Sequence, residues 1–168
     1  MKIFLKTDDE IELMRRANRL VGSTLAEVAK NIKPGVSTLE LDRIAEEFIR
    51  DHGAIPTFKG FPNPYGDPFP AALCTSVNNV VVHGVPSGDV ILKDGDIVSV
   101  DCGTLLDGFN GDSAYTFCVG DVPSEVRQLL KVTKESLYLG IEQAVHGRHV
   151  GDIGAAVQDY CEGYGYGV

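Results

Sequence analysis

The sequence has no tryptophan, only two methionines, and four widely spaced cysteines with no Cys-x-x-Cys pair. Such thiols are expected to be small buried apolar side chains rather than a disulfide framework. No apolar run approaches the roughly 20 residues that span a bilayer. The N-terminal stretch also lacks the apolar core and cleavage site of a signal peptide. The sequence therefore predicts a cytoplasmic protein with no membrane partner.

Basic residues are outnumbered, with 15 Lys and Arg against 24 Asp and Glu and a formal net charge of −9. They are scattered and form no stripe, so binding to a nucleic acid backbone is disfavoured. An acidic chain instead favours cationic substrates and metal ions. With 168 residues, 43% of them hydrophobic, the chain is long enough for one domain with a core. We predict a single domain over residues 1–168.

Four segments repeat apolar residues with the helical period. The first two open with a capping box, from Thr7 and from Ser37. A loop is expected over 54–72, which holds five of the eight prolines. The helices are predicted from Thr7 to near Lys33, from Ser37 to Gly53, from Pro123 to Val145, and from a cap at Asp152 to near Glu162.

Strands rich in valine and isoleucine are expected over Leu73–Val82 and Ile97–Gly103. Asp107 and Gly108 are typical of a two-residue hairpin turn, after which Ser113–Val119 continues the returning strand. Residues 164–168 alternate large side chains with glycine and look like the start of a further strand.

The hairpin brings two carboxylates together. If Asp107 and Gly108 are the turn, Asp112 faces Gly103, and Asp101 lies two residues along on the same face. The Cα atoms of the two aspartates should be roughly 7–8 Å apart. Two buried like charges this close are unfavourable unless one is protonated or a cation lies between them. A divalent metal site and a structural role in turns both remain open.

His83 ends the run NNVVVHG, at an expected strand end. Functional residues often lie at such ends, so His83 is a candidate site residue, with a structural role as the alternative. His52, His146 and His149 lie at or just past predicted helix ends, where an imidazolium suits the helix dipole. We expect these three to be structural or solvated.

Three motifs, CTSVNNVVVHGVPS, LKDGDIVSVDCG and LLDGFNGDSAYTFCVG, resemble those of bacterial type I methionine aminopeptidases. The resemblance extends over the whole chain, residues 1–168. It implies the pita-bread fold, an α+β architecture in which helices cover an antiparallel sheet. It also implies removal of the initiator methionine from nascent polypeptides. The chain would be monomeric when complete, with the ribosome as a further partner.

The resemblance implies site residues as well. The family's members use two divalent metal ions (Co, Mn, Fe or Zn), and some bind a monovalent cation through oxygen atoms. Asp101 would bind one divalent ion, Asp112 would bridge both, and His83 would contact the substrate and assist the leaving group. The methionine pocket would be lined by Phe58, Phe61, Phe69 and Cys74, and the monovalent cation would lie at Asn78 and Val80.

The sequence departs from the family in two places. The connection over 62–73 is longer than usual, and it borders the substrate pocket. The chain also stops before the family's remaining metal ligands, so the C-terminal half of the fold is incomplete. We therefore expect the 168 residues alone to be inactive. We also expect an exposed sheet edge that favours self-association, which light scattering would test.

Two other functions are compatible with the same residues. One is a related pita-bread peptidase that acts before proline, although the Phe109-Asn110-Gly111 stretch favours the methionine enzyme. The other is a peptide-binding module without catalysis, which would have no need of two converging carboxylates. Calorimetric titration with metal distinguishes a competent enzyme from a binder.

Overall fold

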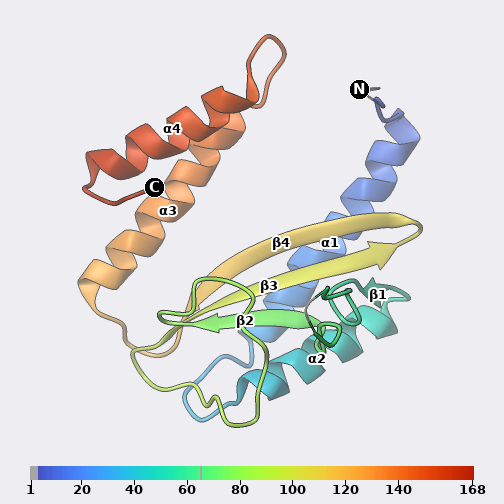
Figure 1. The fold of residues 1–168 in the computed structure, drawn as a ribbon, viewed down its shortest axis with the longest axis vertical. Coiled ribbons are helices and arrows are strands. Elements are labelled where there is room, and N and C mark those ends of the chain that lie inside the picture. Colours follow the sequence, from blue (N-terminus) through green and yellow to red (C-terminus); the bar gives the residue numbers. More distant parts are fainter. Residues whose placement is uncertain (1–3, 65) are drawn as a thin grey trace. The chain divides into compact units, whose positions relative to one another are not determined.

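The computed structural model describes residues 4–64 and 66–168. It contains two compact units, which divide after Asp121. Figure 1 shows the elements of both units. In chain order they are α1 (Asp8–Ala29), α2 (Thr38–Asp51), β1 (Ile55–Pro56), β2 (Leu73–Val77), β3 (Ile97–Leu106), β4 (Phe109–Cys118), α3 (Ser124–Glu142) and α4 (Val150–Gly163).

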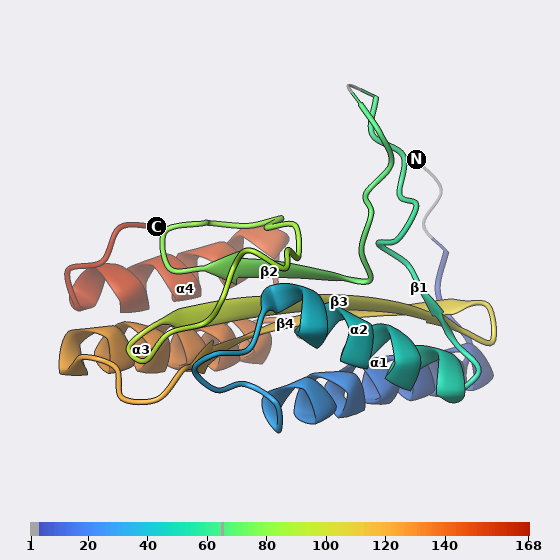
Figure 2. The same ribbon diagram turned by 90° about the horizontal axis from the view of Figure 1, so that it is seen from below.

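The first unit is an antiparallel sheet with two helices on one face. Strand β3 is central, since it pairs with β4 along its whole length and with β2 and β1 on its other side. Figure 2 shows α1 and α2 together on one side of the sheet. Mixed helices and antiparallel strands make the unit α+β, as the sequence predicted.

Alternation along β3 decides which face the helices cover. Val98, Val100, Cys102 and Thr104 are fully buried, and the Thr104 hydroxyl donates to the carbonyl of Ala17 on α1 at 3.3 Å. Burying each apolar side chain of this size contributes roughly 1.5–3 kcal/mol. The residues between them, Asp101 included, therefore point to the opposite face.

The predicted capping box is complete at the start of α1 and incomplete at the start of α2. The Thr7 hydroxyl accepts from the N–H of Glu10 at 3.3 Å, and the Glu10 carboxylate accepts from the N–H of Thr7 at 2.8 Å. The Ser37 hydroxyl accepts from the N–H of Glu40 at 3.2 Å, but the Glu40 carboxylate binds Arg43 instead of closing a second box. Gly53, with φ of 74°, follows α2 as predicted.

Two strand predictions are wrong. Strand β2 ends at Val77 and not at Val82, because Asn78 adopts a left-handed conformation with φ of 51° that an extended strand cannot continue through. Residues 78–82 form an exposed loop. Residues 164–168 are not a strand either, since Gly165 turns the chain with φ of 81° directly after α4.

The second unit is an antiparallel helical hairpin of α3 and α4. Gly140 on α3 lets Ile153 and Val157 of α4 approach closely, and the Tyr160 hydroxyl donates to Glu135 at 2.9 Å. Pro123 precedes α3, close to its predicted place. Asp152 does not begin α4.

The N-cap residue of α4 is His149, whose N–H donates to the Asp152 carboxylate at 2.8 Å. His149 therefore lies at a helix N-terminus, where the dipole does not favour an imidazolium, so the expected fit to the dipole is wrong. The expected solvent exposure of His149 is confirmed, since its side chain is 91% exposed. His52 does lie at the C-terminal end of α2, as predicted. Within the described residues no helix is both long and apolar enough to cross a membrane.

Candidate metal site

The hairpin of β3 and β4 has the predicted register. Asp107 and Gly108 form its turn with φ of 50° and 81°, the two positive values that a type I′ turn requires. Asp112 is paired with Gly103, and Asp101 lies two residues along β3. The two carboxylates are therefore diagonal neighbours on the face away from α1 and α2.

Asp101 is half-buried, and burial raises the pKa of its carboxyl above the usual range. The charge of Asp112 raises this pKa further, while a hydrogen bond from the Cys102 N–H and the charge of His83 lower it. Asp112 and His83 thus both act on Asp101 through space. A cation near the pair would stabilise the ionised form of Asp101.

The expectation of two buried carboxylates is wrong for Asp112, whose side chain is exposed. Asp112 lies on β4, which pairs only with β3 among the described residues. A strand at the edge of a sheet exposes more of each side chain than a central strand does. The repulsion between the two aspartates is consequently screened more by water than the sequence alone predicts.

Cys74 is the cross-strand neighbour of Asp101 on β2, and it is buried. Burial raises the pKa of its thiol to about 11, with further increases from the charges of Asp101, Asp112 and Asp42. The thiol is therefore protonated at neutral pH and cannot serve as a nucleophile there. It is suited to apolar contact, as the predicted pocket role requires.

Phe58 lies against Gly103 on the same face. A Cβ atom at Gly103 would come within 2.7 Å of the Phe58 ring and would also meet the Thr57 hydroxyl. The space above Gly103, opposite Asp112, is therefore filled by these two side chains. Thr57, whose N–H donates to the Gly103 carbonyl at 3.0 Å, was not predicted. The contact between Thr57 and Gly103 follows from the pairing of β1 with β3. No short sequence motif predicts that pairing.

Phe61 and Phe69 lie at the base of a projecting loop. The Phe69 N–H donates to the Phe61 carbonyl at 3.0 Å, and the Gly60 N–H donates to the Phe69 carbonyl at 2.8 Å. Phe61 is 65% exposed, and Phe69 is half-buried. Figure 2 shows this loop rising from the sheet on the side away from α1 and α2, which is the side of the carboxylates.

His83 lies in the exposed loop between β2 and β3, not at a strand end, and has φ of 58°. The next residue fixes this loop to β2, because the Thr75 N–H donates to the Gly84 carbonyl at 2.8 Å. The Gly84 N–H in turn donates to the Ser76 hydroxyl at 3.2 Å. A side chain at Gly84 would collide with the Thr75 carbonyl. The close contact between this loop and β2, which positions His83, therefore requires glycine at residue 84.

Asn78 holds the start of the same loop to the turn before β3. Its side-chain oxygen accepts from the Ile97 N–H at 3.0 Å, and its amide donates to Asp96 at 2.8 Å. Val80 is partly exposed, and its N–H donates to the Val77 carbonyl at 3.1 Å. A role for Asn78 and Val80 in binding a monovalent cation stays a prediction.

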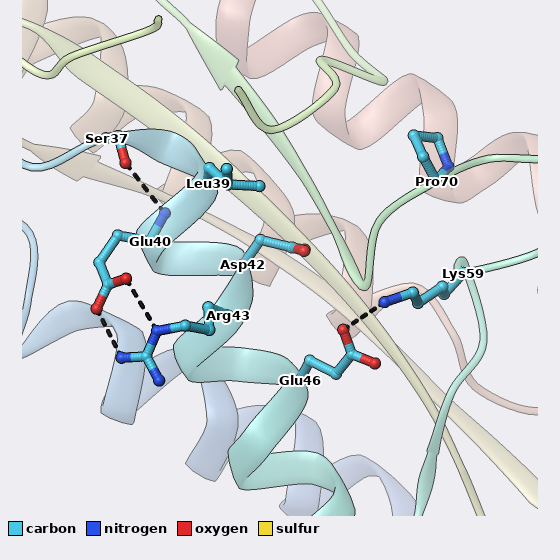
Figure 3. A pocket seen from close by; sticks show the side chains of 8 residues that line it. All are labelled: Ser37, Leu39, Glu40, Asp42, Arg43, Glu46, Lys59 and Pro70. Atoms are coloured by element: carbon cyan, nitrogen blue, oxygen red, sulfur yellow. Dashed lines mark hydrogen bonds and ion pairs between the residues drawn. The ribbon is translucent and has the colours of Figure 1, made fainter. Parts of the chain in front are cut away.

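A cavity of about 380 Å³ lies between α2 and the base of the projecting loop, and Figure 3 shows the side chains that line it. Its charged groups are paired, with Lys59 on Glu46 at 2.6 Å and Arg43 on Glu40 at 2.7 Å. Asp42 is buried, which raises the pKa of its carboxyl, and it accepts from the Leu73 N–H at 2.7 Å.

These contacts hold both ends of the loop, since Lys59 lies before it and Leu73 after it. The cavity itself contains neither Asp101 nor Asp112. It is better explained as a structural junction than as the reaction site.

The donor set agrees with part of a divalent metal site. Asp101 and Asp112 offer hard oxygen ligands, which Mn²⁺, Fe²⁺, Co²⁺ and Zn²⁺ all accept. In residues 4–64 and 66–168 there is no group of three or more His, Cys, Asp or Glu side chains arranged to hold an ion. The pair therefore fits as two of the ligands that such an ion needs.

The sheet has helices on one face and a diagonal pair of carboxylates on the other, an arrangement that is compatible with a metal-binding protein. Residues 12–168 match the family described as "Metallopeptidase family M24". The chain belongs to this family, and its fold is the pita-bread fold.

Curated relatives match nearly the whole chain. It is 51% identical over 166 residues to "Methionine aminopeptidase" of Clostridium acetobutylicum, covering 99% of this chain and 64% of that protein. It is 48% identical over 160 residues to "Methionine aminopeptidase 1" of Bacillus subtilis, covering 95% of this chain and 62% of that protein. The chain thus spans a little under two thirds of the length of these relatives.

Solved structures match in the same way. The methionine aminopeptidase from Rickettsia prowazekii superposes with a TM-score of 0.92 at 40% identity, covering 99% of this chain and 65% of that one. The Xaa-Pro dipeptidase from Bacillus anthracis superposes with a TM-score of 0.79 at 23% identity, covering 97% and 43%. The second likeness concerns the fold alone.

Proposed function

We propose that the protein removes the N-terminal methionine from polypeptides, and that these residues supply Asp101 and Asp112 to its metal site and His83 to its substrate site. The main support is the strand register, which brings the two carboxylates together on one face beside Cys74. The relatives named methionine aminopeptidase support the substrate class.

Bound divalent ions would supply Lewis acid chemistry, polarising the carbonyl of the scissile peptide bond. The carboxylates of Asp101 and Asp112 also provide negative charge, which attracts the substrate's ammonium group. The exposed imidazole of His83 is a hydrogen-bond partner for the substrate near the scissile bond and can pass a proton to the leaving amine.

The apolar groups beside the carboxylates account for selection of methionine. Phe58 packs on Gly103, and Cys74 lies across from Asp101, so a ring and a thiol flank the pair. A thioether makes favourable contacts with aromatic rings and other polarisable groups. Phe61 and Phe69 at the loop base complete the proposed pocket.

The finer assignments belong to the same proposal. Two ions are bound in the complete enzyme, and each is Co, Mn, Fe or Zn. A monovalent cation lies at Asn78 and Val80. The protein acts in the cytoplasm on nascent chains, with the ribosome as a partner. The alternative of a peptidase acting before proline has weaker support, because those neighbours are only 19–24% identical.

Methionine release from a Met-Gly peptide with Mn²⁺ tests the function. The 168 residues alone are expected to give only background, since the described residues offer two metal ligands and no third. A longer chain carrying the part of the relatives that lies beyond this match is expected to release methionine. Absence of release from that longer chain, with Mn²⁺, Fe²⁺, Co²⁺ and Zn²⁺ each supplied, would contradict the proposal.

His83→Ala in the longer chain is expected to lower kcat for methionine release roughly 100-fold, because a general acid contributes about 10² to 10⁴ in rate. Metal affinity, measured by calorimetry, should change little, since His83 is not a proposed ligand. His52→Ala removes another exposed histidine and serves as the matched control. Equal kcat values in the two variants would exclude His83 from catalysis.

A further inference from the structure

A second cavity, of about 280 Å³, lies on the helix side of the first unit. It is separate from the carboxylate pair, which occupies the other face of the sheet. Three elements form it: the middle of α1, the C-terminal end of α2 and the tip of the β3–β4 hairpin. Its lining residues are Arg16, Arg19, Leu20, Ser23, His52 and Leu106.

The lining combines cationic groups with an apolar floor. Arg16, Leu20 and Ser23 are spaced by four and three residues, so they share one face of α1. Leu20 is only 7% exposed and contributes the apolar floor of the cavity together with Leu106. Arg16 and Arg19 together bring two guanidinium groups to this cavity, in a chain of net charge −9.

The arginines around the cavity are incompletely neutralised. Arg16 pairs with Asp107 at 2.9 Å. Arg19 is 71% exposed, and its ion pair with Glu12 is long, at 3.8 Å. The same Glu12 is held more closely by Arg15. Three guanidinium groups therefore share two carboxylates in these ion pairs, and Arg19 has the weakest partner.

His52 contributes a further donor when its ring is the imidazolium. Its Nδ1 donates to the Phe48 carbonyl at 2.8 Å, because a carbonyl can only accept, and its ring stacks on Phe48 with centroids 4.2 Å apart. These contacts fix the ring and leave Nε2 for a ligand. Because Nδ1 carries the proton that is donated to Phe48, Nε2 is an acceptor in the neutral ring and a donor only in the imidazolium. The carbonyls of Phe48, Ile49 and Arg50 at the helix end already accept hydrogen bonds, which reduces their repulsion of an anion.

We propose that this cavity binds a phosphate group, either as the free anion or as a small monoester. A tetrahedral oxyanion offers several acceptors, which match two guanidinium forks, the Nε2–H of the His52 imidazolium and a hydroxyl, whereas one carboxylate matches a single arginine. The volume is slightly below the roughly 300–1,000 Å³ typical of drug-sized ligands, which favours a small anion. The net negative charge opposes a polyanionic nucleic acid.

Calorimetric titration of the chain with inorganic phosphate tests the proposal, against chloride at equal ionic strength. Phosphate is expected to bind and chloride is not. Arg19→Ala should weaken phosphate binding at least about tenfold, given what a hydrogen bond to a charged group contributes. Arg19→Lys should weaken it less, because lysine keeps the charge but loses the planar fork. Arg43→Ala is the matched control, since Arg43 pairs with Glu40 and Glu47 elsewhere on α2.

Amide chemical shifts provide a second measurement, with phosphate-induced changes expected at Arg19, Ser23 and His52. If Arg19→Ala fails to fold, Ser23→Ala provides another variant. Titration with glycerol phosphate distinguishes the two proposed ligands. Tighter binding than inorganic phosphate indicates that the ligand is a monoester, and equal binding indicates that it is the free anion. Equal phosphate affinities for Arg19→Ala and Arg43→Ala, or equal heats with phosphate and chloride, would overturn the proposal.

Discussion

Asp101→Asn is expected to abolish Mn²⁺ binding by this chain, lowering the affinity at least about 100-fold. Loss of a partner outside the ligand shell typically costs 10- to 100-fold, and loss of a direct ligand costs no less. Asp112→Asn should have the same effect, because the two carboxylates share one face of the hairpin. Calorimetric titration measures both. In a longer, active chain, either substitution should reduce methionine release to background.

Asp107→Asn is the matched control for these variants. It removes a carboxylate from the same hairpin, and asparagine tolerates the positive φ of 50° at this turn. Mn²⁺ affinity should stay at the wild-type value. If the control weakens binding as much as Asp101→Asn does, general loss of negative charge and not coordination would explain the result.

In the metal-free chain, Asp101→Asn should increase the stability of the fold. Burial and Asp112 raise the pKa of Asp101 in the folded state, so folding favours its protonated form. Stability therefore decreases as pH rises through this pKa, and Asn removes the penalty above it. Charges about 7 Å apart near a protein surface repel by roughly 2.4 kcal/mol. Because Asp112 is exposed and screened by water, we expect a smaller gain of roughly 1 kcal/mol. Urea unfolding at pH 7 without metal measures it.

Gly111→Ala is expected to destabilise the chain by about 3 kcal/mol, the upper part of the range for overpacking a close-packed site. A Cβ atom at residue 111 would lie 2.5 Å from the Ala17 carbonyl oxygen and 2.8 Å from the Asn18 nitrogen. Both are backbone atoms of α1 and cannot rotate away. Because Asp112 follows directly, the shift of β4 should also weaken Mn²⁺ binding.

Gly22→Ala provides the contrasting control. Gly22 lies within α1, and an added Cβ would meet nothing within 4 Å. Alanine in a helix interior is more favourable than glycine by about 0.8–1.0 kcal/mol, so this variant should be more stable than wild type. Urea unfolding compares the two. Changes of the same sign would show that contact with α1 does not explain the effect of Gly111→Ala.

The sequence predicts the hairpin well because its information is local. Asp107 and Gly108 determine the turn, and the turn determines the register that joins Gly103 to Asp112. The capping box at Thr7 is local in the same sense, since all its atoms lie within four residues. Local signals are not always sufficient, since the Glu40 carboxylate binds Arg43 instead of closing the box at Ser37, and His149 instead of Asp152 caps α4.

The errors arise where distant segments meet. Valines at 80–82 predicted a strand, but the left-handed Asn78 is held by Asp96 and Ile97, some 18 residues away. The contact of Thr57 with Gly103 depends on β1 pairing with the far end of β3. The exposure of Asp112 depends on which strand lies at the edge. None of these follows from periodicity or from a short motif.

The projecting loop at residues 60–70 has a consequence for how the site can change over evolutionary time. Its two ends are held separately, by the Lys59–Glu46 ion pair before it and the Asp42–Leu73 hydrogen bond after it. Doubling the length of a loop adds only about 0.6 kcal/mol of closure entropy. Insertions here can therefore accumulate at little thermodynamic cost while Phe58 and Cys74 keep their places, which makes this loop a tolerant position for new specificity.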